Sequence, residues 1–280
     1  MKEIYAHDIE QAVCRLFLEA NYIISPDIKA EMERQLKQDG FPLAKATLEQ
    51  IIQNFQIAEE EKIPLCQDCG MALLFAEIGT DIHIHGDFEA AVNRGVSTAY
   101  REGYLRKSVV AEPLFERKNT NDNTPAIIYT KIKPGDQLKL TAVAKGFGSE
   151  NTSRMKMFIP SNTIEEIEAF VLETVSMAGP SACPPLIVGV GIGGTFDKAA
   201  LMAKCATFRT VGVHNPDPRY AGLEEKWLAD VNRLGIGPAG FGGATTAIAV
   251  NIEHYATHIA SIPVAVNLCC QASRHAELTL

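Results

Sequence analysis

The stretch ACPPLIVGVGIGGTFDKAALMAKC, residues 182–205, organises the second half of this 280-residue chain. Its first part is a short apolar run, which is typical of a buried strand, and its last part has the periodicity of a helix. The pattern therefore predicts a strand, a glycine turn and a helix. Glycines at the end of a strand also let another group approach the backbone closely.

The glycine turn satisfies the G-x-G-x-x-G pattern of dinucleotide sites, from Gly189 to Gly194. Such a site also needs an acidic residue about 20 positions further on, where it binds the ribose hydroxyls. The sequence there is RTVGVHNPDP, and no acidic residue ends a second strand. Two interpretations remain open: a helix start that faces an anion or a cluster, and tight packing of a helix on a strand.

Helical periodicity dominates the first 62 residues, and strands mixed with helices follow. We expect helices at 8–20, 26–39, 42–60, 163–178 and 223–234, with a further one capped by Asp87, and strands at 71–79, 81–85, 126–133, 137–145, 248–252 and 264–268. Pro134-Gly135-Asp136 has the composition of a hairpin turn, and Ser161 or Asn162 can cap helix 163–178. We predict an α+β fold in which a helical N-terminal layer, residues 1–62, packs on an irregular mixed α/β body, residues 63–280, as one continuous domain.

Composition and charge restrict the partners. The chain is 46% hydrophobic and 21% charged, which is ordinary for a globular protein, and its net charge of −8 argues against binding to nucleic acid. The weakly polar stretches are shorter than the roughly 20 apolar residues of a bilayer helix, and the N-terminus lacks the pattern of a signal peptide. We predict a cytoplasmic protein that binds neither nucleic acid nor membrane.

Seven cysteines, an odd number without a secretory signal, predict reduced thiols. Most of them fall in three groups, LCQDCG, SACPP and LCCQASRH, that lie at the edges of predicted elements beside polar or proline residues. Local spacing leaves open whether these groups converge on a metal. Cys66 and Cys69 form a C-x-x-C that lacks a second half for a zinc site.

Two histidines, His83 and His85, are two positions apart on a predicted strand and therefore face the same side. No third ligand is near them in the sequence. We interpret them as a polar sheet face.

Six motifs, taken in order, resemble the N-terminal part of class I, iron-sulfur-dependent fumarate hydratases, and specifically their separate alpha subunit. They are CQDCG at Cys66–Gly70, REGYLRKSVV at Arg101–Val110, KGFGSEN at Lys145–Asn151, ACPP at Ala182–Pro185, GIGPAGFGG at Gly235–Gly243 and Cys-x-Ala-x-Arg at Cys270–Arg274. The resemblance covers about three quarters of the chain. L-tartrate dehydratase alpha subunits share several of these motifs, so the fold and the cluster are implied more firmly than the substrate.

The resemblance implies a 4Fe-4S cluster held by Cys66, Cys183 and Cys270, with one iron open to act as a Lewis acid. The Cys-x-Ala-x-Arg motif selects Cys270 over its neighbour Cys269. Cys69 stands where the family usually has threonine, and we favour a small polar-site substitution over a fourth ligand.

The resemblance also supplies candidate residues for the chemistry. Asp68 matches a catalytic base, with a turn aspartate as the alternative, and Arg106 matches a carboxylate-binding residue, with a solvated arginine as the alternative. His258 matches an active-site histidine, although a structural histidine is the ordinary reading. Gln67 and the backbone N–H of Gly148 are further candidate substrate contacts.

The resemblance implies a lyase that reversibly hydrates fumarate to L-malate, a step of the tricarboxylic acid cycle. One-chain members of the family have a further C-terminal domain that contacts the substrate, so we expect a separate beta subunit to complete the site for a small dicarboxylate. We also expect the alpha chain to form a homodimer. The alternatives are an L-tartrate dehydratase alpha subunit and a non-catalytic module that binds iron-sulfur or zinc.

Overall fold

The computed structural model describes residues 2–280. Its helices are α1 Ala6–Tyr22, α2 Pro26–Gln38, α3 Pro42–Glu61, α4 Phe88–Glu102, α5 Phe147–Glu150, α6 Ile164–Ala178, α7 Phe196–Ala206 and α8 Pro218–Arg233, with short 3-10 turns η1 Gly179–Ala182 and η2 Pro238–Gly240. Its strands are β1 Lys2–Tyr5, β2 Met71–Gly79, β3 Ile82–His85, β4 Ile127–Lys133, β5 Leu138–Lys145, β6 Arg154–Phe158, β7 Leu186–Gly193, β8 Ala247–Tyr255, β9 Ile262–Cys269 and β10 His275–Thr279. The helices and mixed sheets confirm the α+β prediction.

The chain divides into two compact units. Unit 1 comprises the residues up to Ser25, residues 54–147 and residues 274–280, and unit 2 comprises residues 26–53 and 148–273. The domain limits expected from the sequence, 1–62 and 63–280, stay a prediction.

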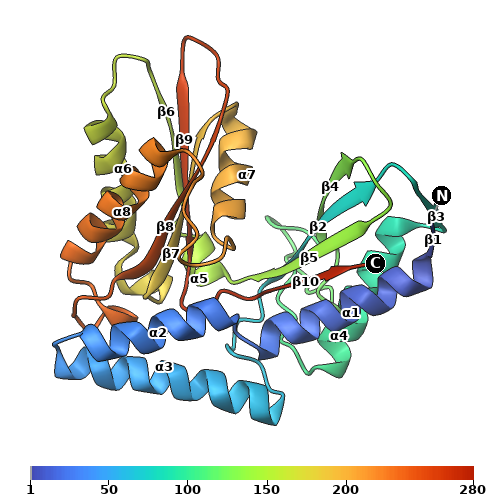
Figure 1. Cartoon of the computed structure of the whole chain (residues 1–280). Coiled ribbons are helices and arrows are strands. Elements are labelled where there is room, and N and C mark those ends of the chain that lie inside the picture. The colour runs from blue at the N-terminus through green and yellow to red at the C-terminus, as the bar shows by residue number, and fades with distance from the viewer. Residues whose placement is uncertain (1) are drawn as a thin grey trace. The chain divides into compact units, whose positions relative to one another are not determined.

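Unit 1 is built on a four-stranded sheet with the order β10-β5-β2-β4. α1 and α4 lie against one face of this sheet (Figure 1). Alternate residues of β2 and β5 point toward these helices, because successive strand residues face opposite sides. The apolar side chains that these two strands bury on this face are Ala72, Leu74, Ala76, Leu138, Leu140, Ala142 and Ala144.

The predicted hairpin in unit 1 is wrong. β4 and β5 are consecutive, but β2 lies between them and pairs parallel with β4 and antiparallel with β5. The turn that joins β4 to β5 passes over the end of β2, where the backbone N–H of Gly79 donates to the Gln137 carbonyl at 3.0 Å. Turn composition was correct, but strand pairing depends on which apolar strand fills the gap, and turn composition does not specify that.

Three strands were not anticipated from the sequence. β1 pairs parallel with β3, β6 pairs antiparallel with β9, and β10 pairs antiparallel with β5. All three are short, and each has only one buried residue. Edge strands of this kind carry a weak apolar pattern, which explains why they were missed.

Unit 2 contains a second four-stranded sheet, with the order β6-β9-β7-β8. α6 and α8 cover one face of it and α7 covers the other (Figure 1). β7 serves both faces: Val188 and Val190 belong to the core that includes α6 and α8, whereas Gly189 and Gly191 face α7.

The glycines of β7 allow α7 to approach the sheet closely. A Cβ atom added at Gly189 would lie 2.0 Å from the Ala203 carbonyl oxygen, and one at Gly191 would lie 2.1 Å from the Ala199 carbonyl oxygen. No side chain fits at either position. Of the interpretations left open for this motif, tight packing of a helix on a strand is the one that these contacts support.

Helix starts follow local capping chemistry. The Asp87 side chain accepts a hydrogen bond from the Ala90 backbone N–H at 3.0 Å and caps α4, as predicted. α6 is capped by Thr163 rather than by Ser161 or Asn162, and Glu166 completes a capping box. α8 begins at Pro218, five residues before the expected start, after its cap Asp217.

Among residues 2–280, no helix combines the length and the apolar character that a membrane span requires.

The packing of α7 on β7 makes a stability prediction. Gly191→Ala places a methyl group against the Ala199 backbone, so we expect it to destabilise the protein by about 3 kcal/mol. Gly222→Ala is the matched control, because it lies inside α8 with nothing within 4 Å of the added Cβ, and it should stabilise by about 0.5–1 kcal/mol. Urea unfolding measures both. A G191A variant as stable as wild type would contradict the close approach.

Candidate functional site

The candidate site residues are distributed over both units. Unit 1 carries Cys66, Gln67, Asp68 and Arg106, and unit 2 carries Gly148, Cys183, His258 and Cys270.

The loop that contains Cys66 lies between α3 and β2. Cys66 and Asp68 are half-buried and Gln67 is exposed. The backbone N–H of Leu65, immediately before the motif, donates to the Asn21 carbonyl at 2.8 Å. The start of the loop is thus fixed to α1, and three candidate side chains follow one another at the surface of unit 1.

Both carboxylate oxygens of Asp68 accept backbone hydrogen bonds. Oδ1 accepts from the Gly70 N–H at 2.9 Å, and Oδ2 accepts from the Phe147 N–H at 2.7 Å. The first bond closes an Asx turn within the loop, and the second ties the loop to the first residue of α5. Asp68 therefore has the contacts of a turn aspartate, and each oxygen keeps a further lone pair.

Arg274 also contributes to the candidate site, although no role was expected for it from the sequence. Its side chain is buried, with the residue 3% exposed, and its Nη1 donates to the Asp68 carbonyl oxygen. Gly146 leaves room for this arginine: a Cβ there would lie 2.8 Å from Arg274 Nη2 and 3.3 Å from Asp68 Oδ2. The first glycine of KGFGSEN is explained by this contact.

Cys69 connects two of the motifs. Its Sγ accepts from the Arg106 backbone N–H at 3.1 Å and donates to the Cys66 carbonyl at 3.7 Å. Burial raises the pKa of the Cys69 thiol, which favours the neutral form. These contacts are those of a small polar residue that holds the Cys66 loop against the LRKS segment.

Arg106 itself is exposed, and the segment around it is anchored by a buried amide. Asn123 accepts from the Ser108 N–H at 2.7 Å and donates to the Gly70 carbonyl at 3.1 Å. Tyr100 of α4 adds a hydrogen bond from its hydroxyl to the Cys69 carbonyl at 2.6 Å, and burial raises the pKa of this tyrosine. Sequence reasoning missed both residues, because neither belongs to a motif with a chemical signature.

In unit 2, the segments that carry Cys183 and Cys270 lie side by side. Cys183 follows η1 in a left-handed conformation with φ 55°, and its carbonyl accepts from the Gln271 N–H at 3.3 Å. Gln271 directly follows Cys270. Two of the three cysteine groups are therefore brought together within one unit, although Cys183 and Cys270 are 87 positions apart in the sequence.

The neighbouring cysteines 269 and 270 have different surroundings. Cys269 is the last residue of β9 and is buried, with 7% exposed, whereas Cys270 lies beyond the strand and is half-buried. Cys270 is the more accessible of the two.

Other motifs of unit 2 surround Cys183. The Ala239 N–H, in GIGPAGFGG, donates to the Pro184 carbonyl at 2.7 Å. Gly240, at φ +82°, approaches Pro180 so closely that an added Cβ would lie 2.5 Å from its ring. Gly148 is exposed, and an added Cβ there would lie 3.3 Å from the Ser181 carbonyl oxygen. Gly148 is thus close to the turn that carries Cys183.

His258 is not brought near Cys270. It is exposed in the loop before β9, whereas Cys270 directly follows that strand. Eight strand residues at about 3.3 Å each separate the two by about 26 Å. Within a single chain, these two residues do not reach the same small ligand.

Comparison with known proteins places the chain in a family. The profile described as "Fumarate hydratase (Fumerase)" matches residues 10–279. The chain is 41% identical over 273 residues to the putative L(+)-tartrate dehydratase subunit alpha of Methanocaldococcus jannaschii, covering 96% of each protein. It is 32% identical over 265 residues to the L(+)-tartrate dehydratase subunit alpha of Escherichia coli strain K12 and to that of Shigella sonnei, covering 91% of this chain and 87% of each relative. The chain therefore belongs to the fumarate hydratase family. The names of these relatives support the assignment of the chain to the hydro-lyases.

Proposed function

We propose that this chain is the alpha subunit of a hydro-lyase that reversibly hydrates fumarate to L-malate. The observation that supports this most directly is the hydrogen bond between the Cys183 carbonyl and the Gln271 N–H, which brings two cysteine-bearing segments together in a member of the fumarate hydratase family. Neither Cys183 nor Cys270 is buried, so these two cysteines suit a metal cofactor better than core packing.

The proposed cofactor is a 4Fe-4S cluster held by Cys66, Cys183 and Cys270. Their chemistry fits: thiolates are the ordinary ligands of such clusters, and none of the three cysteines is buried. When bound, a cluster with one open iron supplies a Lewis acid for the hydroxyl of the substrate. Thiols that remain reduced also fit a cytoplasmic location.

Asp68 is the proposed base for the carbon-bound proton of malate. Its two backbone hydrogen bonds orient the carboxylate next to Cys66 and leave accepting capacity on each oxygen. The Arg274 contact to the Asp68 carbonyl holds the same residue from the backbone side. A base fixed at both ends gives the constant geometry that proton transfer requires.

The other proposed contacts bind the dianionic substrate. Arg106 presents an exposed guanidinium, which suits a carboxylate because its two N–H groups bind both oxygens. Gln67 and the Gly148 N–H provide neutral donors. The chain carries a net charge of −8, so local donors of this kind are needed to attract an anion.

The proposed role of His258 depends on how many copies of the chain form the site. Because β9 separates it from Cys270, it contacts a substrate bound near Cys270 only if a second copy of the chain supplies it. This is consistent with the homodimer expected from the sequence.

The relatives add two elements to the proposal. Each is named an alpha subunit, which supports a beta partner that completes the site for this chain. Each is also named an L(+)-tartrate dehydratase, so dehydration of tartrate is the second candidate reaction. A non-catalytic iron-sulfur or zinc module is the third.

The ligand assignment predicts that Cys66→Ser, Cys183→Ser and Cys270→Ser each lose most cluster iron in anaerobically purified protein. Serine lacks the thiolate that the cluster requires. Iron and acid-labile sulfide per chain are the measurements. Cys205→Ser, in α7, is the control and should keep the wild-type content. Equal iron in all four variants would remove the assignment, and bound zinc without iron would support the third candidate.

In the chain reconstituted with its beta partner, the role of Asp68 predicts that Asp68→Asn lowers kcat on malate by about 10²–10⁴-fold, because an amide does not accept the proton. Its iron content should stay at the wild-type level. Asp136→Asn, an exposed aspartate in the turn after β4, is the matched control and should leave kcat unchanged. A D68N enzyme with wild-type kcat would show that Asp68 is only a turn residue.

The substrate is decided by rates of the chain reconstituted with its beta partner. We expect the pair to convert malate with a higher kcat/KM than L-tartrate, and the alpha chain alone to turn over neither at a comparable rate. A preference for tartrate would establish the second candidate. Full activity without a partner would disprove the subunit requirement.

A further inference from the structure

A second group of metal-binding residue types lies on the two-stranded sheet of β1 and β3. The strands pair in parallel, with Glu3 opposite His83 and Tyr5 opposite His85. His83 and His85 were interpreted as a polar sheet face because the sequence offers no third ligand near them. The pairing supplies one, Glu3, from 80 positions earlier in the chain.

The sheet presents these residues on one side because its other side is apolar. Ile4 is buried at 4% exposure, and Ile82 and Ile84 pack against the same core. Residues at alternate positions face opposite sides of a strand, so Glu3, His83 and His85 share the outer face. The packing of these isoleucines against the core fixes the backbone that carries the three polar side chains.

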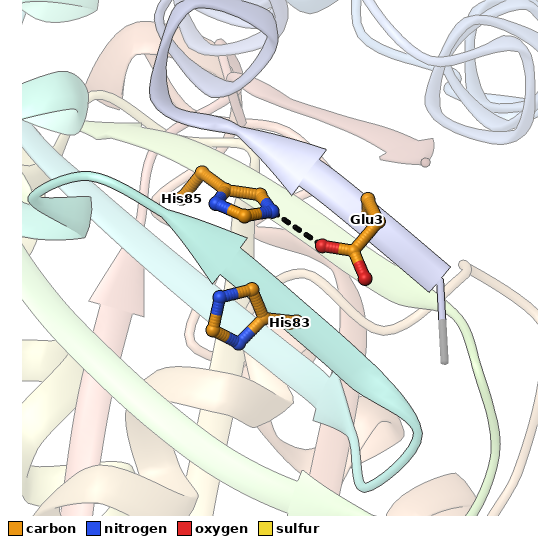
Figure 2. A group of neighbouring side chains, drawn as sticks. All are labelled: Glu3, His83 and His85. Atoms are coloured by element: carbon orange, nitrogen blue, oxygen red, sulfur yellow. Dashed lines mark hydrogen bonds and ion pairs between the residues drawn. The ribbon is translucent and has the colours of Figure 1, made fainter.

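The three side chains converge, as Figure 2 shows. One ligand atom from each of them lies within 4.8 Å of the others. Glu3 Oε2 is hydrogen-bonded to His85 Nε2, and the His83 and His85 rings meet edge to face with centroids 4.4 Å apart. Ligands about 2.0–2.2 Å from one ion lie about 3.3 Å apart, so small side-chain rotations bring these three to coordinating distance.

The orientation of His85 is constrained from outside the group. The Tyr5 ring stacks on the His85 ring, with centroids 4.7 Å apart and planes 15° apart. Stacking leaves the edge of the imidazole, with its nitrogens, directed at Glu3. Holding a ligand side chain in this way reduces the entropy lost when an ion binds.

Two imidazoles and a carboxylate form a donor set with a definite preference. Nitrogen ligands suit zinc and its neighbours in the first transition row, whereas calcium and magnesium take oxygen ligands. Two histidines and one glutamate also leave room for water in a tetrahedral site. The exposed position of Glu3 and His83 leaves the site open to solvent.

We propose that Glu3, His83 and His85 bind a divalent zinc ion at the surface of unit 1, separate from the cysteines assigned to the cluster. The ion joins the first strand of the chain to β3. Its contribution is to hold β1, a strand of four residues, on the sheet.

The test titrates ZnCl₂ into the anaerobic, cluster-loaded full chain and measures bound zinc by equilibrium dialysis. We expect a His83→Gln, His85→Gln double variant to bind one equivalent less than wild type, and Glu3→Gln to weaken that equivalent by about tenfold or more. His7→Gln is the matched control, because His7 is an exposed unit 1 histidine whose ring bonds only to Gln11 among the contacts described. It should bind zinc as wild type does.

X-ray absorption at the zinc edge distinguishes this site from binding to cysteine. The equivalent lost in the double variant should show nitrogen and oxygen ligands at about 2.0–2.1 Å and no sulfur at about 2.3 Å. Zinc should also raise the Tm of wild type and of H7Q more than that of the double variant. Equal zinc in wild type and double variant, or sulfur around every bound zinc, would overturn the proposal and leave the group as an ordinary ion pair.

Discussion

The contact on which the candidate site in unit 1 most depends is the hydrogen bond from the buried Arg274 guanidinium to the Asp68 carbonyl. A hydrogen bond that involves a charged group contributes about 1.5–3 kcal/mol, and removal of one partner leaves the other buried and unpaired. This single bond fixes the backbone of the Cys66 loop at Asp68, while the Gly70 and Phe147 N–H groups fix the Asp68 carboxylate. The position of Asp68 is thus set by three hydrogen bonds, one from the Arg274 side chain and two from backbone N–H groups.

Much of the fold followed from periodicity, because elements with a strong apolar pattern were expected close to where they lie. β2 and α4 are examples, as is the strand–turn–helix of β7 and α7. The failures share a physical cause. β1, β6 and β10 carry few buried residues, and the pairing of β4 with β2 instead of β5 is decided by packing across the sheet. Local sequence specifies how a segment is built more reliably than which segment lies beside it.

Candidate site residues were predictable from the sequence where they belong to a motif with a known chemical role. Residues that only hold the site loops in place were not predictable. Cys183 and Cys270 belong to conspicuous groups, and the structure brings their segments together. In unit 1, Asn123 and Tyr100 hold the Cys66 loop by hydrogen bonds to the Gly70 and Cys69 carbonyls, yet an isolated asparagine and a helical tyrosine look ordinary in a sequence. Glu3 was not recognised as a third ligand for the same reason, since it becomes a neighbour of His83 only through the pairing of two strands 80 positions apart in the sequence.

A resemblance transfers the identity of a residue, but geometry decides which copy of the chain uses it. β9 is a rigid strand, and its eight residues keep His258 and Cys270 at opposite ends. No side-chain rotation closes about 26 Å, because even an extended histidine side chain reaches only a few ångströms beyond its backbone. If both residues serve one substrate, the catalytic unit contains two copies of this chain. The length of one strand therefore links the proposed chemistry to the proposed assembly, and neither is independent of the other.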